Sequence, residues 1–273
     1  MLQLFKMTRP GNIAIALATL AVGCLISGGE VSARLLAADA IAFSLAIAFG
    51  NTLNDILDFR IDSVSHPERP LPSGKVSLFK AKIFCAACPA AALPLAVLVA
   101  QNSFFALFYG SLFFLLFLYD RFLKRIPLAK NATVALLCTT PLVRAAFLPE
   151  ANVRPLIAAT GFAFLLTFAR EIIKDMEDAS GDREGNVVTL SSFLGNGPAR
   201  FLALALILLA TLGIPVPVFL GWLSAIFLAL LVPMIPVDIR ICRETIRGDF
   251  RKAQKWTKAA MPVGLLFLLV ACI

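Results

Sequence analysis

Charged residues are scarce in this sequence. Asp, Glu, Lys and Arg make up 15% of its 273 residues, and 59% of the chain is hydrophobic. A soluble domain carries about 25% charged residues, and no polar stretch here is long enough to form one. The apolar residues instead form blocks that approach the roughly 20 residues needed to cross a bilayer as a helix. The composition therefore predicts a single all-α, polytopic membrane domain over residues 1–273.

Histidine is almost absent, and the cysteines are not arranged for metal binding. His66 is the only histidine. Cys85 and Cys88 have the spacing of a zinc or redox pair, but no second pair accompanies them. A structural zinc site needs four such ligands, so the chain is poorly supplied for one. Most of the six cysteines lie inside apolar runs, where we expect them to be small buried side chains.

The apolar blocks predict about nine membrane-spanning helices. Arg144 falls near the outer end of the fifth, and its side chain is expected to reach outward to water. No acidic residue is expected in the middle of a span. The predicted spans are 11–27, 35–57, 78–100, 104–119, 132–148, 156–173, 201–214, 216–237 and 259–273.

The basic residues are distributed unevenly over the predicted loops. Of the 25 Lys and Arg residues, 22 fall in or beside segments on one side of the membrane, whereas Arg34, Arg144 and Arg154 do not. Loops rich in Lys and Arg stay in the cytoplasm. This topology, and not a nucleic-acid partner, explains the net charge of +8. It predicts a cell-membrane protein whose cytoplasmic segments are 1–10, 58–77, 120–131, 174–200 and 238–258.

Three aspartates mark the cytoplasmic end of the second span. Asp55, Asp58 and Asp62 recur at i, i+3 and i+7 in the string NTLNDILDFRID. On one helix they would lie within about 60° of one another. Like charges on one helical face repel each other, and the C-terminal end of a helix already carries partial negative charge. Something positive must therefore offset these carboxylates.

A second triad repeats the arrangement at the cytoplasmic end of the sixth span. Asp175, Asp178 and Asp182 have the same spacing in REIIKDMEDASGD. Carboxylate oxygens suit Mg²⁺, which completes its shell with water and substrate phosphate. Bound metal ions would neutralise a diphosphate leaving group. The two triads together predict a site for Mg²⁺ and a diphosphate ester.

The segment after the first triad, SVSHPERPLPSG over residues 63–74, is rich in turn-forming residues. Three prolines and a glycine favour a semi-rigid loop over a helix. Such a loop could close over the site and exclude water, or it could be a simple connection.

These residues resemble the signatures of the UbiA superfamily of intramembrane prenyltransferases. The strings from Asn54 to Asp62, from Lys174 to Asp182 and from His66 to Gly74 are similar to family motifs, and the resemblance covers essentially the full chain. It implies nine helices around a central cavity, with Mg²⁺, a prenyl diphosphate and a lipid acceptor from the bilayer as cofactor and substrates.

The resemblance also implies roles for individual residues. Asp58, Asp62, Asp178 and Asp182 are the expected catalytic residues. The expected metal ligands are Asn54, Asp55, Asp58, Asp62, Asp175, Asp178 and Asp182. The expected ligands of diphosphate or phosphate are Arg9, Asn12, Asn51, Arg69, Lys75, Lys124, Lys130, Arg170 and Lys174.

The prediction of the acceptor depends on the residue at one position in the sequence. Quinone and haem O branches of the family often carry a tyrosine four residues before the lysine of the second motif, whereas this chain has Arg170. It therefore resembles the archaeal ether-lipid branch, which implies transfer from geranylgeranyl diphosphate to geranylgeranylglyceryl phosphate. Transfer to an aromatic acceptor and membrane transport are the alternatives. The D-G-x-x-A-R signature of the CDP-alcohol phosphotransferases does not occur.

Overall fold

The computed structural model describes residues 2–100, 103–181 and 190–272. Within these ranges the regular structure is helical, and no strand occurs. In the described part of the chain, eight helices are long and apolar enough to cross a membrane. Helix α7 (Ala129–Ala145), which has 17 residues, lies at the place of the fifth predicted span. The prediction of an all-helical, multi-pass membrane protein is confirmed.

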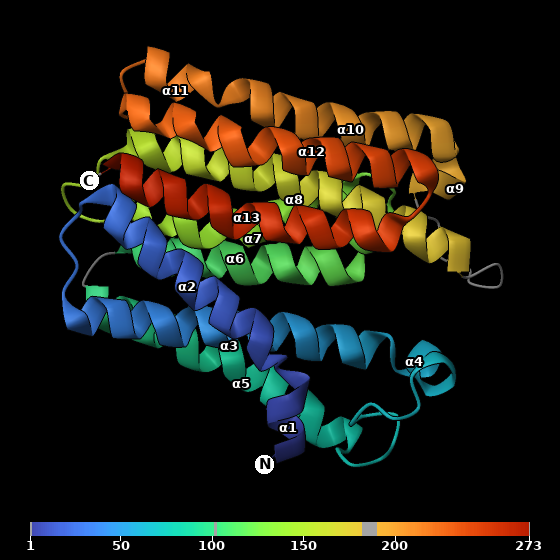
Figure 1. The fold of residues 1–273 in the computed structure, drawn as a ribbon. Helices are drawn as coiled ribbons and strands as arrows, with labels where there is room; N and C mark the ends of the chain where they lie inside the picture. Colours follow the sequence, from blue (N-terminus) through green and yellow to red (C-terminus); the bar gives the residue numbers. More distant parts are fainter. Residues whose placement is uncertain (1, 101–102, 182–189, 273) are drawn as a thin grey trace. The chain divides into compact units, whose positions relative to one another are not determined.

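The first of two compact units contains the residues up to Ala21 together with Glu30–Leu123. In this unit α3 packs against α5 and α6, and these two also pack against each other. Phe43 on α3 meets the ring of Tyr109 on α6 edge to face, with 5.4 Å between centroids. The helices that begin in this unit (Figure 1) are α1 (Leu2–Met7), α2 (Pro10–Ser27), α3 (Ala33–Leu57), α4 (Phe59–Ser65), α5 (Leu78–Ala100), α6 (Ser103–Arg121) and the 3₁₀ turn η1 (Leu123–Arg125).

The second unit contains Val22–Gly29 and Lys124–Ile273. Helix α8 is its centre, because α7, α10 and α13 all pack against it. Besides α7, the helices of this unit are α8 (Val153–Gly181), α9 (Leu190–Leu194), α10 (Asn196–Gly213), α11 (Pro215–Phe219), the 3₁₀ helix η2 (Ala225–Leu230), α12 (Leu231–Arg247) and α13 (Phe250–Cys272).

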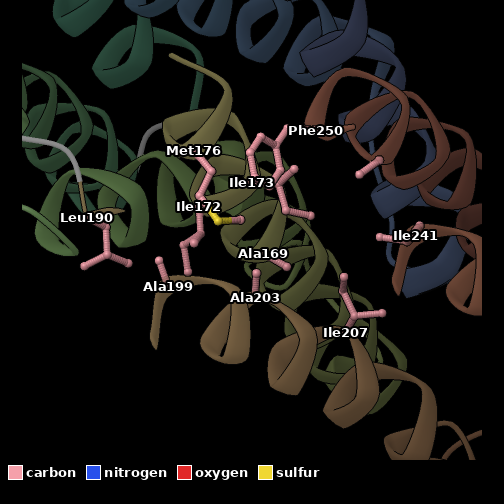
Figure 2. Close-up of a cluster of buried hydrophobic side chains, with 11 residues drawn as sticks. Ala169, Ile172, Ile173, Met176, Leu190, Ala199, Ala203, Ile207, Ile241 and Phe250 are labelled. Atoms are coloured by element: carbon pink, nitrogen blue, oxygen red, sulfur yellow. The ribbon is translucent and has the colours of Figure 1, made fainter. Parts of the chain in front are cut away.

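A buried apolar cluster holds the second unit together and fixes the polar end of α8 (Figure 2). Ala169, Ile172, Ile173 and Met176 lie on one face of α8 because they recur at helical spacing. Alanines on the facing α10 allow its backbone to approach closely, as small residues do in membrane helix pairs. The cluster is completed by Leu190, Ala199, Ala203, Ile207, Ile241, Phe250 and Ala253.

The eighth predicted span is wrong in position. The spans in this region run over Asn196–Phe219 and Ala225–Arg247, and the chain turns at Gly221, where φ is +68°. Pro215 stands in the first turn of α11, where proline is tolerated, so it does not reverse the chain. Because residues 201–237 are almost uniformly apolar, hydropathy could not locate the turn.

The segment 238–258, predicted to lie between the eighth and ninth spans, belongs mostly to the candidate spans Ala225–Arg247 and Phe250–Cys272. It is helical except for a short turn between α12 and α13. Gly248 makes this turn as the left-handed C-cap of α12, with φ +82°.

Charged residues are buried inside the helices, against two expectations. Arg144 is 1% exposed, so the prediction that its side chain reaches outward is wrong. Asp238 is buried in the middle part of the span Ala225–Arg247, so the expectation that no acidic residue lies in the middle of a span is wrong there. Asp39, also buried, lies near the start of α3. Tyr109 donates a hydrogen bond of 2.5 Å to Asp39, and the Thr211 hydroxyl donates to Asp238. These hydrogen bonds between helices reduce the cost of burying a carboxyl group.

Gly29 permits a close approach in the second unit. A Cβ atom at this position would lie 3.0 Å from Leu148 Cβ and 3.0 Å from the Pro149 carbonyl oxygen. We expect Gly29→Ala to destabilise the protein by about 1–3 kcal/mol, because backbone atoms must move to admit the methyl group. Thermal unfolding in detergent measures the change. Gly161→Ala is the matched control, since nothing lies within 4 Å of its added Cβ. Equal melting temperatures of the two variants would contradict the prediction.

Candidate active site

The first aspartate triad does not lie on one continuous helix. Helix α3 ends at Leu57, and Asp58 has φ −91° and ψ 7° before α4 begins. Asp55 therefore lies on α3, Asp58 at the junction and Asp62 on α4, which leaves the line of α3 (Figure 1). The expectation of a single helical face is wrong, because residue spacing cannot reveal one residue with non-helical dihedral angles. Two hydrogen bonds, from Asp58 N to Asn54 O and from Asp62 N to Asp58 O, still bridge the junction.

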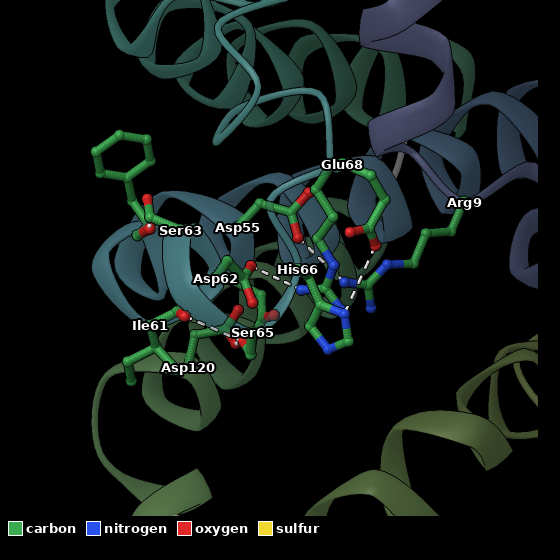
Figure 3. A network of polar contacts seen from close by, with 12 residues as sticks. Arg9, Asp55, Ile61, Asp62, Ser63, Ser65, His66, Glu68 and Asp120 are labelled. Carbon is green, nitrogen blue, oxygen red and sulfur yellow. Dashed lines mark hydrogen bonds and ion pairs between the residues drawn. The ribbon is translucent and has the colours of Figure 1, made fainter.

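Two carboxylates of this triad are paired with arginines (Figure 3). Arg9 Nη2 lies 3.1 Å from Asp55 Oδ1, and Arg69 Nη1 lies 2.6 Å from Asp62 Oδ2. Both aspartate side chains are 6% exposed. Such charge-assisted hydrogen bonds are among the stronger ones in proteins. The protein itself therefore supplies part of the positive charge that the acidic pattern required.

Asn51 holds the backbone that carries Arg9. Its Nδ2 donates to the Thr8 carbonyl at 2.9 Å, next to Arg9, whose φ is +53°. A left-handed backbone costs a residue with a side chain roughly 1–2 kcal/mol, so this conformation needs support from its neighbours. Asn51 was expected to be a phosphate ligand. Here its amide group anchors the segment that connects α1 to α2 onto α3. This contact places Arg9 beside Asp55.

Asp120 joins the first cluster from α6, and sequence reasoning missed it. Its side chain is buried, with the residue 2% exposed, and Asp120 Oδ1 accepts a hydrogen bond of 3.1 Å from Asn54 Nδ2. A signal for it was present. Asp120 stands at the C-terminal end of a span, where the helix dipole disfavours an acidic residue, as it does at the two triads.

The second triad is also held by a basic residue. Lys130 Nζ lies 2.5 Å from Asp175 Oδ1, and Asn131 Nδ2 donates to Asp175 Oδ2 at 3.0 Å. Lys130 and Asn131 both lie in the first turn of α7, so this carboxylate links α7 to α8. Asp178 is exposed on α8, and Asp182 lies outside the described residues.

The remaining expected phosphate ligands are spread over several elements. Arg170 pairs with Glu171 at 2.7 Å. Lys75 lines a surface cavity of about 220 Å³ beside α1, together with Leu2, Gln3, Leu4, Val76 and Lys80. Asn12 and Lys174 are exposed, and Lys124 is half-buried in η1.

The carboxylate and amide oxygens of these clusters suit Mg²⁺, but those that the structure describes do not form a complete coordination shell, or cage, around one ion. In the described part of the chain, no three Asp, Glu, His or Cys side chains converge as ligands of one ion. Mg²⁺ usually takes one or two carboxylates and fills its shell with water and substrate phosphate, so such a cage is not required. Asn131 also has a buried Oδ1 with no hydrogen-bond partner. This oxygen lies beside Asp175 and is available as a metal ligand.

The chain is similar to known proteins over nearly its full length. The digeranylgeranylglyceryl phosphate synthase of Methanopyrus kandleri is 33% identical over 97% of both chains. A solved structure of digeranylgeranylglyceryl phosphate synthase has a TM-score of 0.85 and 26% identity, over 99% of this chain and 98% of that one.

A UbiA homologue from Archaeoglobus fulgidus, solved with GPP and Mg²⁺, has the same fold. Its TM-score is 0.70 at 17% identity, over 97% of this chain and 99% of that one. The model of the UbiA prenyltransferase family matches residues 15–268. The chain belongs to the UbiA prenyltransferase family.

Proposed function

We propose that this prenyltransferase joins the geranylgeranyl group of geranylgeranyl diphosphate to the free hydroxyl of geranylgeranylglyceryl phosphate, with Mg²⁺ as cofactor. The reaction forms the second ether bond of archaeal membrane lipid. The observation that carries the proposal is the likeness to synthases of this name over nearly the full length of both chains. Arg170 in place of tyrosine supports the same acceptor.

Four residues are proposed to hold Mg²⁺: Asn54, Asp58, Asp178 and Asp182. When bound, the metal neutralises the diphosphate as the allylic C–O bond breaks. Asp58 is half-buried at the α3–α4 junction and Asp178 is exposed on α8, so both side chains are accessible to an arriving ligand. Each also occupies the matching position of its family motif.

The basic residues paired with the triads are proposed to bind the phosphate groups. Asp55, Asp62 and Asp175 hold Arg9, Arg69 and Lys130 in place through the ion pairs described above. Guanidinium groups match phosphate oxygens in geometry and charge. In this proposal these three aspartates act by placing cations, and Asn51 supports Arg9 in the same way.

The whole chain is proposed to work as one catalytic domain, with both triads at the cytoplasmic side of the cell membrane. The family match covers parts of both compact units, and the distribution of basic residues favours this orientation.

Competition between two acceptors tests the function. Membranes containing the protein would be given radiolabelled geranylgeranyl diphosphate, geranylgeranylglyceryl phosphate and an aromatic hydroxy acid, with Mg²⁺ or with EDTA. We expect label to enter only the ether lipid, and only with Mg²⁺. Transfer to the aromatic acid alone would overturn the proposed acceptor. Turnover that persists in EDTA would overturn the proposed cofactor.

A further inference from the structure

The contact between Asn54 and Asp120 joins two helices at the first acidic cluster. Asn54 lies in the last turn of α3, and Asp120 lies near the end of α6. The two helices pack within one compact unit. Asn54 Nδ2 donates to Asp120 Oδ1 at 3.1 Å, and Asp120 is 2% exposed. Figure 3 places Asp120 within the same polar network as Asp55 and Asp62.

This contact allows only one orientation of the Asn54 amide. An ionised carboxylate accepts hydrogen bonds and donates none, whereas an amide has one donating and one accepting side. If the amide were flipped, its oxygen would face a carboxylate oxygen and the hydrogen bond between the two side chains would be lost, which is costly at a buried site. The donor side therefore faces Asp120, and Asn54 Oδ1 points away from that carboxylate, available as a ligand.

We propose that Asp120 is a positioning residue for the metal: it fixes the amide of Asn54 so that Oδ1 is presented to the cation of the first cluster. This rests on the proposed function, in which Asn54 is a Mg²⁺ ligand. Asp120 acts through Asn54 and does not itself bind the metal. Its role therefore differs from that of Asp58.

Asp120→Asn tests the proposal, because the new amide is similar in shape but can pair with Asn54 in either orientation. In one of them Asn54 Oδ1 accepts a hydrogen bond from residue 120 and is no longer presented to a metal. Binding of Mn²⁺, a paramagnetic substitute for Mg²⁺, would be measured by electron paramagnetic resonance in detergent with inorganic diphosphate. We expect about a tenfold weaker Mn²⁺ affinity, from the difference between a charged and a neutral hydrogen bond. The half-saturating Mg²⁺ for turnover should rise by a similar factor, with kcat at saturating Mg²⁺ nearly unchanged.

Asp39→Asn is the matched control. Asp39 is also a buried carboxyl that links α3 to α6, through Tyr109, but it takes no part in the proposed site. We expect its Mn²⁺ affinity to equal that of the wild type. An equal loss of Mn²⁺ affinity in Asp39→Asn and Asp120→Asn would show that the effect comes from helix packing, and would overturn the proposal.

Two double variants separate positioning from direct binding. In an Asn54→Ala background, Asp120→Asn should cause no further loss of Mn²⁺ affinity, since residues that act as one unit are non-additive. An additive loss would make Asp120 a ligand and overturn the proposal.

The second double variant exchanges the two side chains, as Asn54→Asp with Asp120→Asn. It keeps one carboxylate, one amide and one hydrogen bond, so it can test the proposal even if Asp120→Asn alone does not fold. We expect the exchange to recover affinity to within about threefold of the wild type, because the pair again has one defined orientation.

Failure of this inference is distinguishable from failure of the proposed function. If the wild type transfers the prenyl group with Mg²⁺ and Asp120→Asn binds Mn²⁺ as the wild type does, only the positioning role is overturned. The role is equally overturned if the exchanged pair folds and does not recover affinity. If the wild type shows no metal-dependent prenyl transfer, the proposed function itself fails.

Discussion

Asp58→Asn should lower kcat at saturating Mg²⁺ by at least about a hundredfold, because removal of a metal ligand forfeits several kcal/mol of charge stabilisation in the transition state. Asp178→Asn should have an effect of the same size. Each substitution keeps the shape of the side chain and removes its negative charge. Initial rates with labelled geranylgeranyl diphosphate, measured over a range of Mg²⁺ concentrations, give the result.

A folded control is needed because the triads also lie in ion-pair networks. Asp249→Asn removes a carboxylate from the turn between α12 and α13, where Asp249 pairs with Lys252 at 2.7 Å. We expect this variant to keep wild-type turnover. The Asp58 and Asp178 variants should unfold at nearly the wild-type temperature in the absence of Mg²⁺. Near-normal turnover of either one in Mg²⁺ would remove that residue from the site.

The sequence predicted best what depends on local chemistry. The third span, 78–100, coincides with α5, and the second begins and ends within two residues of α3. Apolar blocks bounded by charges fix such helices because the bilayer accepts few other structures. The acidic ends of α3 and α8 were also recognised, since an aspartate near a helix C-terminus is unfavourable wherever it occurs, although Asp120 at the end of α6 was missed.

The partners of the aspartates could not be predicted in the same way. Asn54 and Asp120 are 66 residues apart in sequence, and Asn131 and Asp175 are 44 apart. Which side chains meet depends on how α3 packs on α6 and how α7 packs on α8, and hydropathy carries no information on that register. The sixth span was predicted to end at residue 173 because its apolar residues end there. The helix continues to Gly181, since its backbone hydrogen bonds do not require apolar side chains.

The pairing of Lys130 with Asp175 gives the other large expected effect. The Asp175 side chain is 3% exposed and that of Lys130 is 17% exposed. Lys130→Met would leave a buried carboxylate with the Asn131 amide but without its cation. Breaking a buried ion pair in this way costs roughly 3–5 kcal/mol. We expect a loss of this size in the free energy of unfolding, measured by denaturation in mixed micelles of mild detergent and sodium dodecyl sulfate.

A double variant separates the stability of the pair from its function. Lys130→Met combined with Asp175→Leu removes both charges, and replacement of a buried pair by apolar groups is often nearly neutral. We therefore expect the double variant to recover most of the stability lost in Lys130→Met. It should not recover turnover, because Lys130 is proposed to bind phosphate and Met cannot. Recovery of both would make the pair purely structural and would remove Lys130 from the proposed phosphate site. A Lys130→Met protein as stable as the wild type would contradict the buried ion pair itself.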